Sequence, residues 1–302
     1  MVTHDAPRAA LDIGSNTIRL LVARPSGDTL RKLDDVSEFV RLGKGVDASG
    51  KLQPDRVDAA LEAIRRLAER GRSSGAGTPI AIATSAVRDA ANGQEFVDRV
   101  RKETGIDVRV LSGDEEARLT FLGATLGRSL DGGAVVVDLG GGSAEIIAAD
   151  SNGISWARSL QFGSGRLTEQ FIHHDPPQMT ELNAVATYVK QMLSGLPPAT
   201  AHVSIFTGGT ATTVPRLLRT EGETVTITPA EIARVVELLA SQSAQDVARH
   251  YGVQLQRAEV LPAGVKAIQT IEEFYRTREI VITSGGIREG AILEAERGAF
   301  AP

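Results

Sequence analysis

The chain has 302 residues, enough for two domains, and 42% of them are hydrophobic, an ordinary fraction for a globular protein. The absence of cysteine excludes disulfides, thiolate zinc sites and cysteine nucleophiles. The net charge of −5 is spread over interspersed acidic and basic residues, so no DNA-binding surface is expected. Without a membrane-length apolar run or a basic leader at the N-terminus, we expect a cytoplasmic protein with no signal peptide and no membrane partner.

The first predicted element is a β-hairpin over residues 11–22, LDIGSNTIRLLV. Two apolar runs flank a turn that contains Gly14 and Asn16, and Asp12 precedes that turn. Glycine lets the backbone approach a ligand closely, the amides of such a turn can bind an anion, and a carboxylate at its mouth can hold a hard cation. The pattern therefore indicates a phosphate-binding turn, although a plain tight hairpin has the same composition.

The next elements alternate between strand and helix. We predict a strand and turn over 30–42, a helix over 54–71, a buried strand over 80–84, an amphipathic helix over 94–104 and a strand over 107–111. Arg88 follows the 80–84 strand among small polar residues, where its guanidinium can bind a phosphate or simply lie on the surface.

A helix start follows at Ser112, in the sequence SGDEEAR. Ser112 and Glu115 have the spacing of a capping box, so Glu115 is assigned to the helix N-terminus. Consecutive side chains on a helix point about 100° apart, so Glu116 faces elsewhere. It is then available for chemistry, or merely exposed.

The plan of the first hairpin recurs at residues 135–148, VVVDLGGGSAEIIA, where Asp138 precedes a glycine turn that ends at Ser143. Two strand–turn–strand units of one design suggest a duplicated architecture with two facing lobes. Residues 126–133 are the expected crossover between them.

The second half continues the alternation. We predict strands over 154–160, 203–206 and 279–283 and helices over 164–171, 177–194, 211–218, 229–241, 258–274 and 288–296. Gly208 and Gly209 join a strand to a helix start, which is a natural anion or nucleotide site. The alternation of strands and helices predicts an α/β fold.

Six motifs in this order and spacing resemble the exopolyphosphatase / guanosine pentaphosphate phosphohydrolase family: ALDIGSNTIRLLV, TSAVRDA, LSGDEEARLTFLGA, VVDLGGGSAEI, FTGGT and SGGIREGAIL. That family belongs to the acetate kinase–Hsp70–actin superfamily. The resemblance implies two actin-like (ribonuclease H-like) lobes of duplicated βββαβα type with an interdomain cleft. The lobes would span 1–125 and 126–287, and a C-terminal helix of about 288–302 would pack back on the first. The chain resembles the short, two-domain members.

The resemblance also implies roles for individual residues. Glu116 matches the general base, and Glu145 matches a second essential carboxylate near the attacking water and the metal. Asp138, with Glu145, would bind Mg²⁺ or another divalent cation. The phosphate-binding positions that match are Asn16, Arg88, Gly141, Gly142, Ser143, Gly208 and Gly209. Neighbouring carboxylates are expected to raise the pKa of Glu116.

The substrate implied is linear polyphosphate. The nearest rival substrate is the guanine nucleotide pppGpp, because the same loops would serve both. An actin-fold ATPase or sugar kinase is a further possibility, and so is a non-catalytic sensor that binds polyphosphate or alarmone. A homodimer is a hypothesis that no residue pattern demonstrates.

Overall fold

The computed structural model describes residues 6–27, 29–220 and 222–298. Within them the chain divides into two compact units. Unit 1 runs to Arg128 and resumes at Gly285, and unit 2 spans Ser129–Ser284. The end of the expected C-terminal helix, 299–302, and the N-terminal residues 1–5, where no leader is expected, lie outside the described residues.

Unit 1 contains one five-stranded sheet and six helices among its described residues. The strands are β1 (Arg8–Ile13), β2 (Thr17–Ser26), β3 (Thr29–Phe39), β4 (Ile80–Ala83) and β5 (Val108–Val110), in the order β3-β2-β1-β4-β5. The helices are α1 (Val46–Ser49), α2 (Pro54–Ser73), α3 (Ser85–Asp89), α4 (Gly93–Thr104), α5 (Gly113–Ala124) and α14 (Ile287–Glu296). Strands β1 to β3 are antiparallel, whereas β1, β4 and β5 are parallel.

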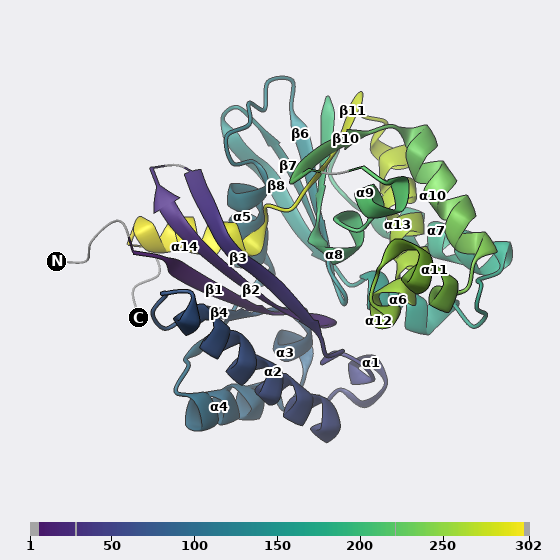
Figure 1. The fold of residues 1–302 in the computed structure, drawn as a ribbon. Helices are drawn as coiled ribbons and strands as arrows, with labels where there is room; N and C mark the ends of the chain where they lie inside the picture. Colours follow the sequence, from purple (N-terminus) through teal and green to yellow (C-terminus); the bar gives the residue numbers. More distant parts are fainter. Residues whose placement is uncertain (1–5, 28, 221, 299–302) are drawn as a thin grey trace. The chain divides into compact units, whose positions relative to one another are not determined.

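The sheet of unit 1 is covered by helices on both faces. Successive side chains of a strand point to opposite sides, so its buried apolar strands present apolar side chains to both layers of helices. Leu11 and Leu20 belong to the apolar cluster that includes α2 and α4. Ala10 and Leu21, one residue away, belong to the cluster that includes α5 and α14. Figure 1 shows α14, in yellow, against the purple strands β1 and β2 and beside α5. The last helix of the chain therefore completes the first unit.

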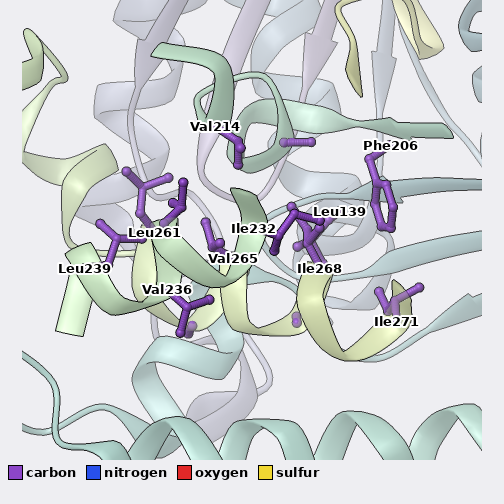
Figure 2. Packing of buried hydrophobic residues seen from close by; sticks show 14 of the residues in the cluster. Leu139, Phe206, Val214, Ile232, Val236, Leu239, Leu261, Val265, Ile268 and Ile271 are labelled. Carbon is purple, nitrogen blue, oxygen red and sulfur yellow. The ribbon is translucent and has the colours of Figure 1, made fainter. Parts of the chain in front are cut away.

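Unit 2 contains a six-stranded sheet of order β10-β11-β9-β6-β7-β8. Its strands are β6 (Ala134–Leu139), β7 (Ala144–Asp150), β8 (Gly153–Leu160), β9 (Val203–Thr207), β10 (Thr224–Ile227) and β11 (Glu279–Thr283). Its helices are α6 (Ser164–Phe171), α7 (Met179–Leu193), α8 (Gly208–Ala211), α9 (Val214–Leu218), α10 (Pro229–Ser241), α11 (Ala244–Tyr251), α12 (Leu255–Ala258) and α13 (Leu261–Tyr275). The core of unit 2 is one apolar cluster to which β6, β9, α10 and α13 contribute, among others through Leu139, Phe206, Ile232 and Ile268 (Figure 2).

The two sheets confirm the duplicated α/β architecture. The order β3-β2-β1-β4-β5 corresponds, with the same strand directions, to β8-β7-β6-β9-β11. The two hairpin turns close alike: the Gly14 amide donates to the Thr17 carbonyl at 3.1 Å, and the Gly140 amide donates to the Ser143 carbonyl at 3.0 Å. No helix of the described residues is long and apolar enough to cross a membrane.

Several predicted boundaries are wrong, and proline explains two of them. The helix predicted over 211–218 is two short helices, because Pro215 has no amide hydrogen to continue the α8 ladder and instead lies in the first turn of α9. Pro262 likewise separates α12 from α13 within the predicted 258–274 helix. The helix predicted from Pro177 begins at Met179, after the cap residue Gln178. Helix α3, which carries Arg88, is absent from the predicted elements.

Candidate active site

The first turn, between β1 and β2, is fixed by the chain that follows β3. The carbonyl of Asn16 accepts the amides of Val40 and Arg41, both at 2.9 Å, and the carbonyl of Ser15 accepts the amide of Gly43 at 2.8 Å. The side chain of Asn16 is buried, and its Nδ2 has no hydrogen-bond partner among the described residues. An unpaired buried amide nitrogen is costly, so this donor points to an anionic or polar ligand.

Arg88 and Glu116 form an ion pair in the same unit. Arg88 lies on α3, and its Nη1 donates to Glu116 Oε2 at 2.7 Å and to the Leu111 carbonyl at 3.0 Å. Glu116 is 5% exposed, at the start of α5. The sequence suggested neighbouring carboxylates around Glu116, whereas the structure places a guanidinium group against it.

Glu115 takes the capping role predicted for it. Its carboxylate accepts the Ser112 amide at 2.9 Å and the Ser112 hydroxyl at 2.8 Å, and it also pairs with Arg109. These bonds, from the amide first and then the hydroxyl, hold the pKa of Glu115 below its ordinary value. The two adjacent glutamates therefore differ in structure: Glu115 caps the start of α5, whereas Glu116 is buried beside Arg88.

Asn16, Arg88 and Glu116 come together because the parallel strands β1, β4 and β5 end at the same edge of the sheet. Strands β1 and β4 are parallel neighbours in register from Ala10 with Ile80 to Ile13 with Ala83, so the Asn16 turn and α3 both follow the carboxyl end of this sheet. Ligands of open α/β sheets bind at that edge. Unit 1 therefore brings Asn16, Arg88 and Glu116 to one edge.

The second turn, between β6 and β7, is fixed by the start of α6. The Gly140 carbonyl accepts the Ser164 amide at 2.9 Å, and the Gly141 carbonyl accepts the Gly165 and Arg166 amides at 2.9 and 3.1 Å. A methyl group on Gly163 would lie 2.6 Å from the Gly142 nitrogen, so only glycine allows this approach.

Asp138 and Glu145 stand opposite each other in the β6–β7 ladder, so their side chains lie on the same face of the sheet. Glu145 is buried and accepts the Ser159 hydroxyl at 2.8 Å from β8. In unit 1 the corresponding register partner of Asp12 is Arg19, a cation. Among the described residues there is no cluster of three or more His, Cys, Asp or Glu side chains arranged for a metal ion.

The third turn, Gly208-Gly209, follows β9 and approaches the carboxylate of Asp138. Gly208 has a φ of 91°, and a methyl group there would lie 2.6 Å from Asp138 Oδ1. A methyl group on Gly209 would overlap the guanidinium of Arg257. Nothing in the sequence pointed to Arg257, because α12 is too short to show a period and its contact with the turn is long-range. Thr210 Oγ1 is buried without a partner in the described part of the chain.

The sequence profile of the Ppx/GppA phosphatase family matches residues 21–298. The chain belongs to this family. It is 30% identical to exopolyphosphatase 1 of Mycobacterium tuberculosis (strain ATCC 25618 / H37Rv) over 296 residues, which cover 94% of this chain and 86% of that protein. It is 25% identical to a guanosine-5'-triphosphate,3'-diphosphate pyrophosphatase of Vibrio atlanticus (strain LGP32), over 95% of this chain and 58% of that protein.

The fold agrees with solved structures of Ppx/GppA proteins. The crystal structure of an exopolyphosphatase from Cytophaga hutchinsonii has a TM-score of 0.87 and 25% identity to this chain, and the match covers 97% of this chain and 98% of that one. The resemblance and the two-lobed α/β fold are thus confirmed, whereas the interdomain cleft and the roles of individual residues stay predictions.

A buried charge network in this Ppx/GppA chain ties α14 to the strands of unit 1. Arg288 is 1% exposed, and its Nη1 donates to Asp35 Oδ1 at 2.6 Å and to the Leu20 carbonyl at 3.1 Å. Burial opposes the charge of Arg288, but the nearby Glu289, Asp35 and Asp12 outweigh it and raise its pKa. Burial also raises the pKa of Asp35, but the attraction and hydrogen bond of Arg288 outweigh it and hold that pKa below its ordinary 3.8.

We expect this pair to contribute acid sensitivity. Because the pKa of Asp35 is lower in the folded chain, its stabilisation is present above pH 3.8 and is lost as the pH falls through the folded-state value. Asp35→Asn should lower the melting temperature at pH 7 and flatten its decline in acid, measured by calorimetry from pH 7 to pH 2. Asp34→Asn, at a position that pairs with the exposed Arg70, is the control. An acid decline as steep in Asp35→Asn as in wild type would contradict the assignment.

Proposed function

We propose that this Ppx/GppA protein is an exopolyphosphatase that releases orthophosphate from the end of linear polyphosphate. The observation that carries the proposal is the ion pair of the buried Glu116 with the half-buried Arg88, at the same sheet edge as an unpartnered Asn16 amide nitrogen in the described chain. A base can activate the attacking water, and a phosphate-binding cation and a neutral donor can position the phosphate in phosphoanhydride hydrolysis. A relative that matches most of this chain and is named exopolyphosphatase 1 supports the same activity.

The Arg88–Glu116 bond suggests how substrate prepares the base. A terminal phosphate takes the guanidinium of Arg88 and the Nδ2 of Asn16 as donors, since charge-assisted bonds to phosphate are strong. Glu116, released from Arg88, then orients a water molecule in line with the terminal anhydride bond. The water oxygen bonds to phosphorus, Glu116 accepts its proton, and the bridging oxygen leaves with the shortened chain.

The carboxylates of Asp138 and Glu145 suit a hard divalent cation, because Mg²⁺ is commonly held by one or two carboxylates together with substrate phosphates. Such an ion would neutralise charge that develops on the phosphoryl oxygens. In this proposal, the turn amides of Gly141, Gly142 and Ser143 and the Gly208-Gly209 turn are the phosphate-binding groups of unit 2.

Removal of one of these carboxylates should weaken metal binding. For Glu145→Gln we expect a higher Mg²⁺ concentration at half-maximal phosphate release, and weaker Mn²⁺ binding in calorimetric titrations without substrate, because an anionic oxygen ligand is lost. Asp150→Asn, at the far end of β7, is the matched control. Equal Mn²⁺ affinity in wild type and Glu145→Gln would remove Glu145 from the metal site.

The second candidate is hydrolysis of the 5′ γ-phosphate of pppGpp, which the Vibrio relative favours. Release of phosphate from polyphosphates of several lengths and from pppGpp, with and without Mg²⁺, distinguishes the two. An exopolyphosphatase should show a higher kcat/KM for polyphosphate and dependence on Mg²⁺. Faster release from pppGpp would assign the second activity, and tight binding of either ligand without release would indicate a sensor.

A further inference from the structure

Three non-glycine residues of the described chain have a left-handed backbone, and all are arginines: Arg41, Arg219 and Arg276. A side chain is strained in this conformation, whereas glycine adopts it freely. Arg219 and Arg276 end the helices α9 and α13, where a cation interacts favourably with the helix C-terminus. Arg41 follows the strand β3, so that explanation does not apply to it.

The segment from Arg41 to Gly45 is built onto the first phosphate turn. The amides of Val40 and Arg41 both donate to the Asn16 carbonyl, and the left-handed φ of 52° at Arg41 then turns the chain so that the Gly43 amide donates to the Ser15 carbonyl. A methyl group on Gly43 would lie 3.0 Å from Cβ of Ser15 and 3.3 Å from Cβ of Ala86. The segment therefore packs between the turn that carries Asn16 and the helix α3 that carries Arg88.

Two cations extend from this segment. The guanidinium of Arg41 lies 5.6 Å from the centre of the Phe39 ring, and Phe39 is the register partner of Thr17, which directly follows the turn. This contact keeps the half-buried Arg41 side chain next to the turn. Lys44 is exposed in the same chain reversal, where its amide donates to the Arg41 carbonyl at 3.1 Å.

We propose that Arg41 and Lys44 form a second anion subsite beside Asn16, which binds the phosphate next to the one that is cleaved. The inference rests on the proposed function and specifies its substrate class: a polyanion with charge beyond its terminal phosphate. Arg88 and Asn16 hold the reacting phosphate, whereas Arg41 and Lys44 add affinity for the remainder of the chain. Because Lys44 is exposed to solvent, its share of the affinity falls as salt rises.

Arg41→Gly tests the subsite, since glycine keeps the left-handed backbone and removes only the side chain. We expect KM for long-chain polyphosphate to rise about threefold to tenfold at low salt, with kcat within about twofold of wild type and no loss of melting temperature. Lys44→Gln should raise KM in the same direction. The matched controls, Arg219→Gly and Arg276→Gly, remove left-handed arginines from helix ends in unit 2 and should leave KM unchanged.

The salt dependence of KM is the second readout. In Arg41→Gly the increase of KM with ionic strength should be shallower than in wild type, because fewer cations contribute to binding. Equal KM values for wild type and both variants would overturn the subsite and leave the proposed hydrolysis intact. If wild type binds polyphosphate without releasing phosphate, the proposed function fails, and the dissociation constants of the same variants decide on the subsite. If wild type does not bind polyphosphate, both are wrong.

Discussion

Glu116→Gln is expected to lose about 10²- to 10⁴-fold in kcat while the protein stays folded and still binds polyphosphate. The amide has the shape of the carboxylate but cannot accept the proton of the attacking water. Arg88 keeps its bond to the Leu111 carbonyl in this variant, so α3 remains attached to the chain that precedes α5. The rate of phosphate release at saturating polyphosphate measures the loss of kcat. The equilibrium dissociation constant for polyphosphate tests whether the variant still binds its substrate.

Glu115→Gln is the matched control for that loss. This variant makes the same change, from a carboxylate to an amide, at the neighbouring residue. The Glu115 carboxylate that it replaces caps α5 through Ser112. We expect it to lower stability by about 1 kcal/mol, as loss of a helix cap does, and to keep most of the turnover. Near-normal kcat in Glu116→Gln, or an equal loss in both variants, would show that Glu116 is not the base.

Gly290→Ala should lower the melting temperature by roughly 6–12 °C, which corresponds to about 3 kcal/mol of overpacking in a domain of this size. Helices α5 and α14 cross with their backbones in contact: a methyl group on Gly290 would overlap the Leu119 carbonyl oxygen and lie 2.7 Å from its carbon. A backbone carbonyl cannot rotate away, so α5 must shift, and Glu116 moves with it. Calorimetry and kcat measured on one preparation should therefore fall together.

Gly71→Ala separates this effect from the general cost of changing a glycine in a helix. Gly71 lies in the last turns of α2, and its methyl group would make ordinary contacts of 3.6 and 3.7 Å with Leu20 and Ala9. Alanine also favours the helix more than glycine, so we expect an unchanged or higher melting temperature. A melting temperature of Gly290→Ala as high as that of Gly71→Ala would mean that the two helices can separate without cost.

The parts of the fold that were predicted correctly depend on local patterns. The paired hairpins follow from an aspartate, a glycine turn and two apolar runs, all within a short stretch of chain. The capping box at Ser112 is read from residues three apart, and it is confirmed. The strand β10 was missed, because its four residues at the sheet edge alternate too briefly to show a period.

The parts that were not predicted depend on contacts between distant residues. Nothing near Asp35 indicates that Arg288, 253 residues later, is its partner. The position of Arg257 over Gly209 and the approach of Gly290 to α5 are likewise properties of packing. Arg88 was predicted to bind phosphate from its motif, and that role stays a prediction, whereas its bond to Glu116 could not be predicted because it joins two elements whose relation only the fold determines.

The two hairpins differ in one place that affects their charge. Each half of the duplication carries an acidic residue before its glycine turn, and β2 supplies a positive neighbour across the ladder where β7 supplies a second negative one. Like charges set opposite each other repel, and a divalent ion relieves that repulsion. The proposed divalent ion would therefore bind beside the second hairpin and not the first, so a chelator is expected to disturb the second hairpin while the first keeps its local structure.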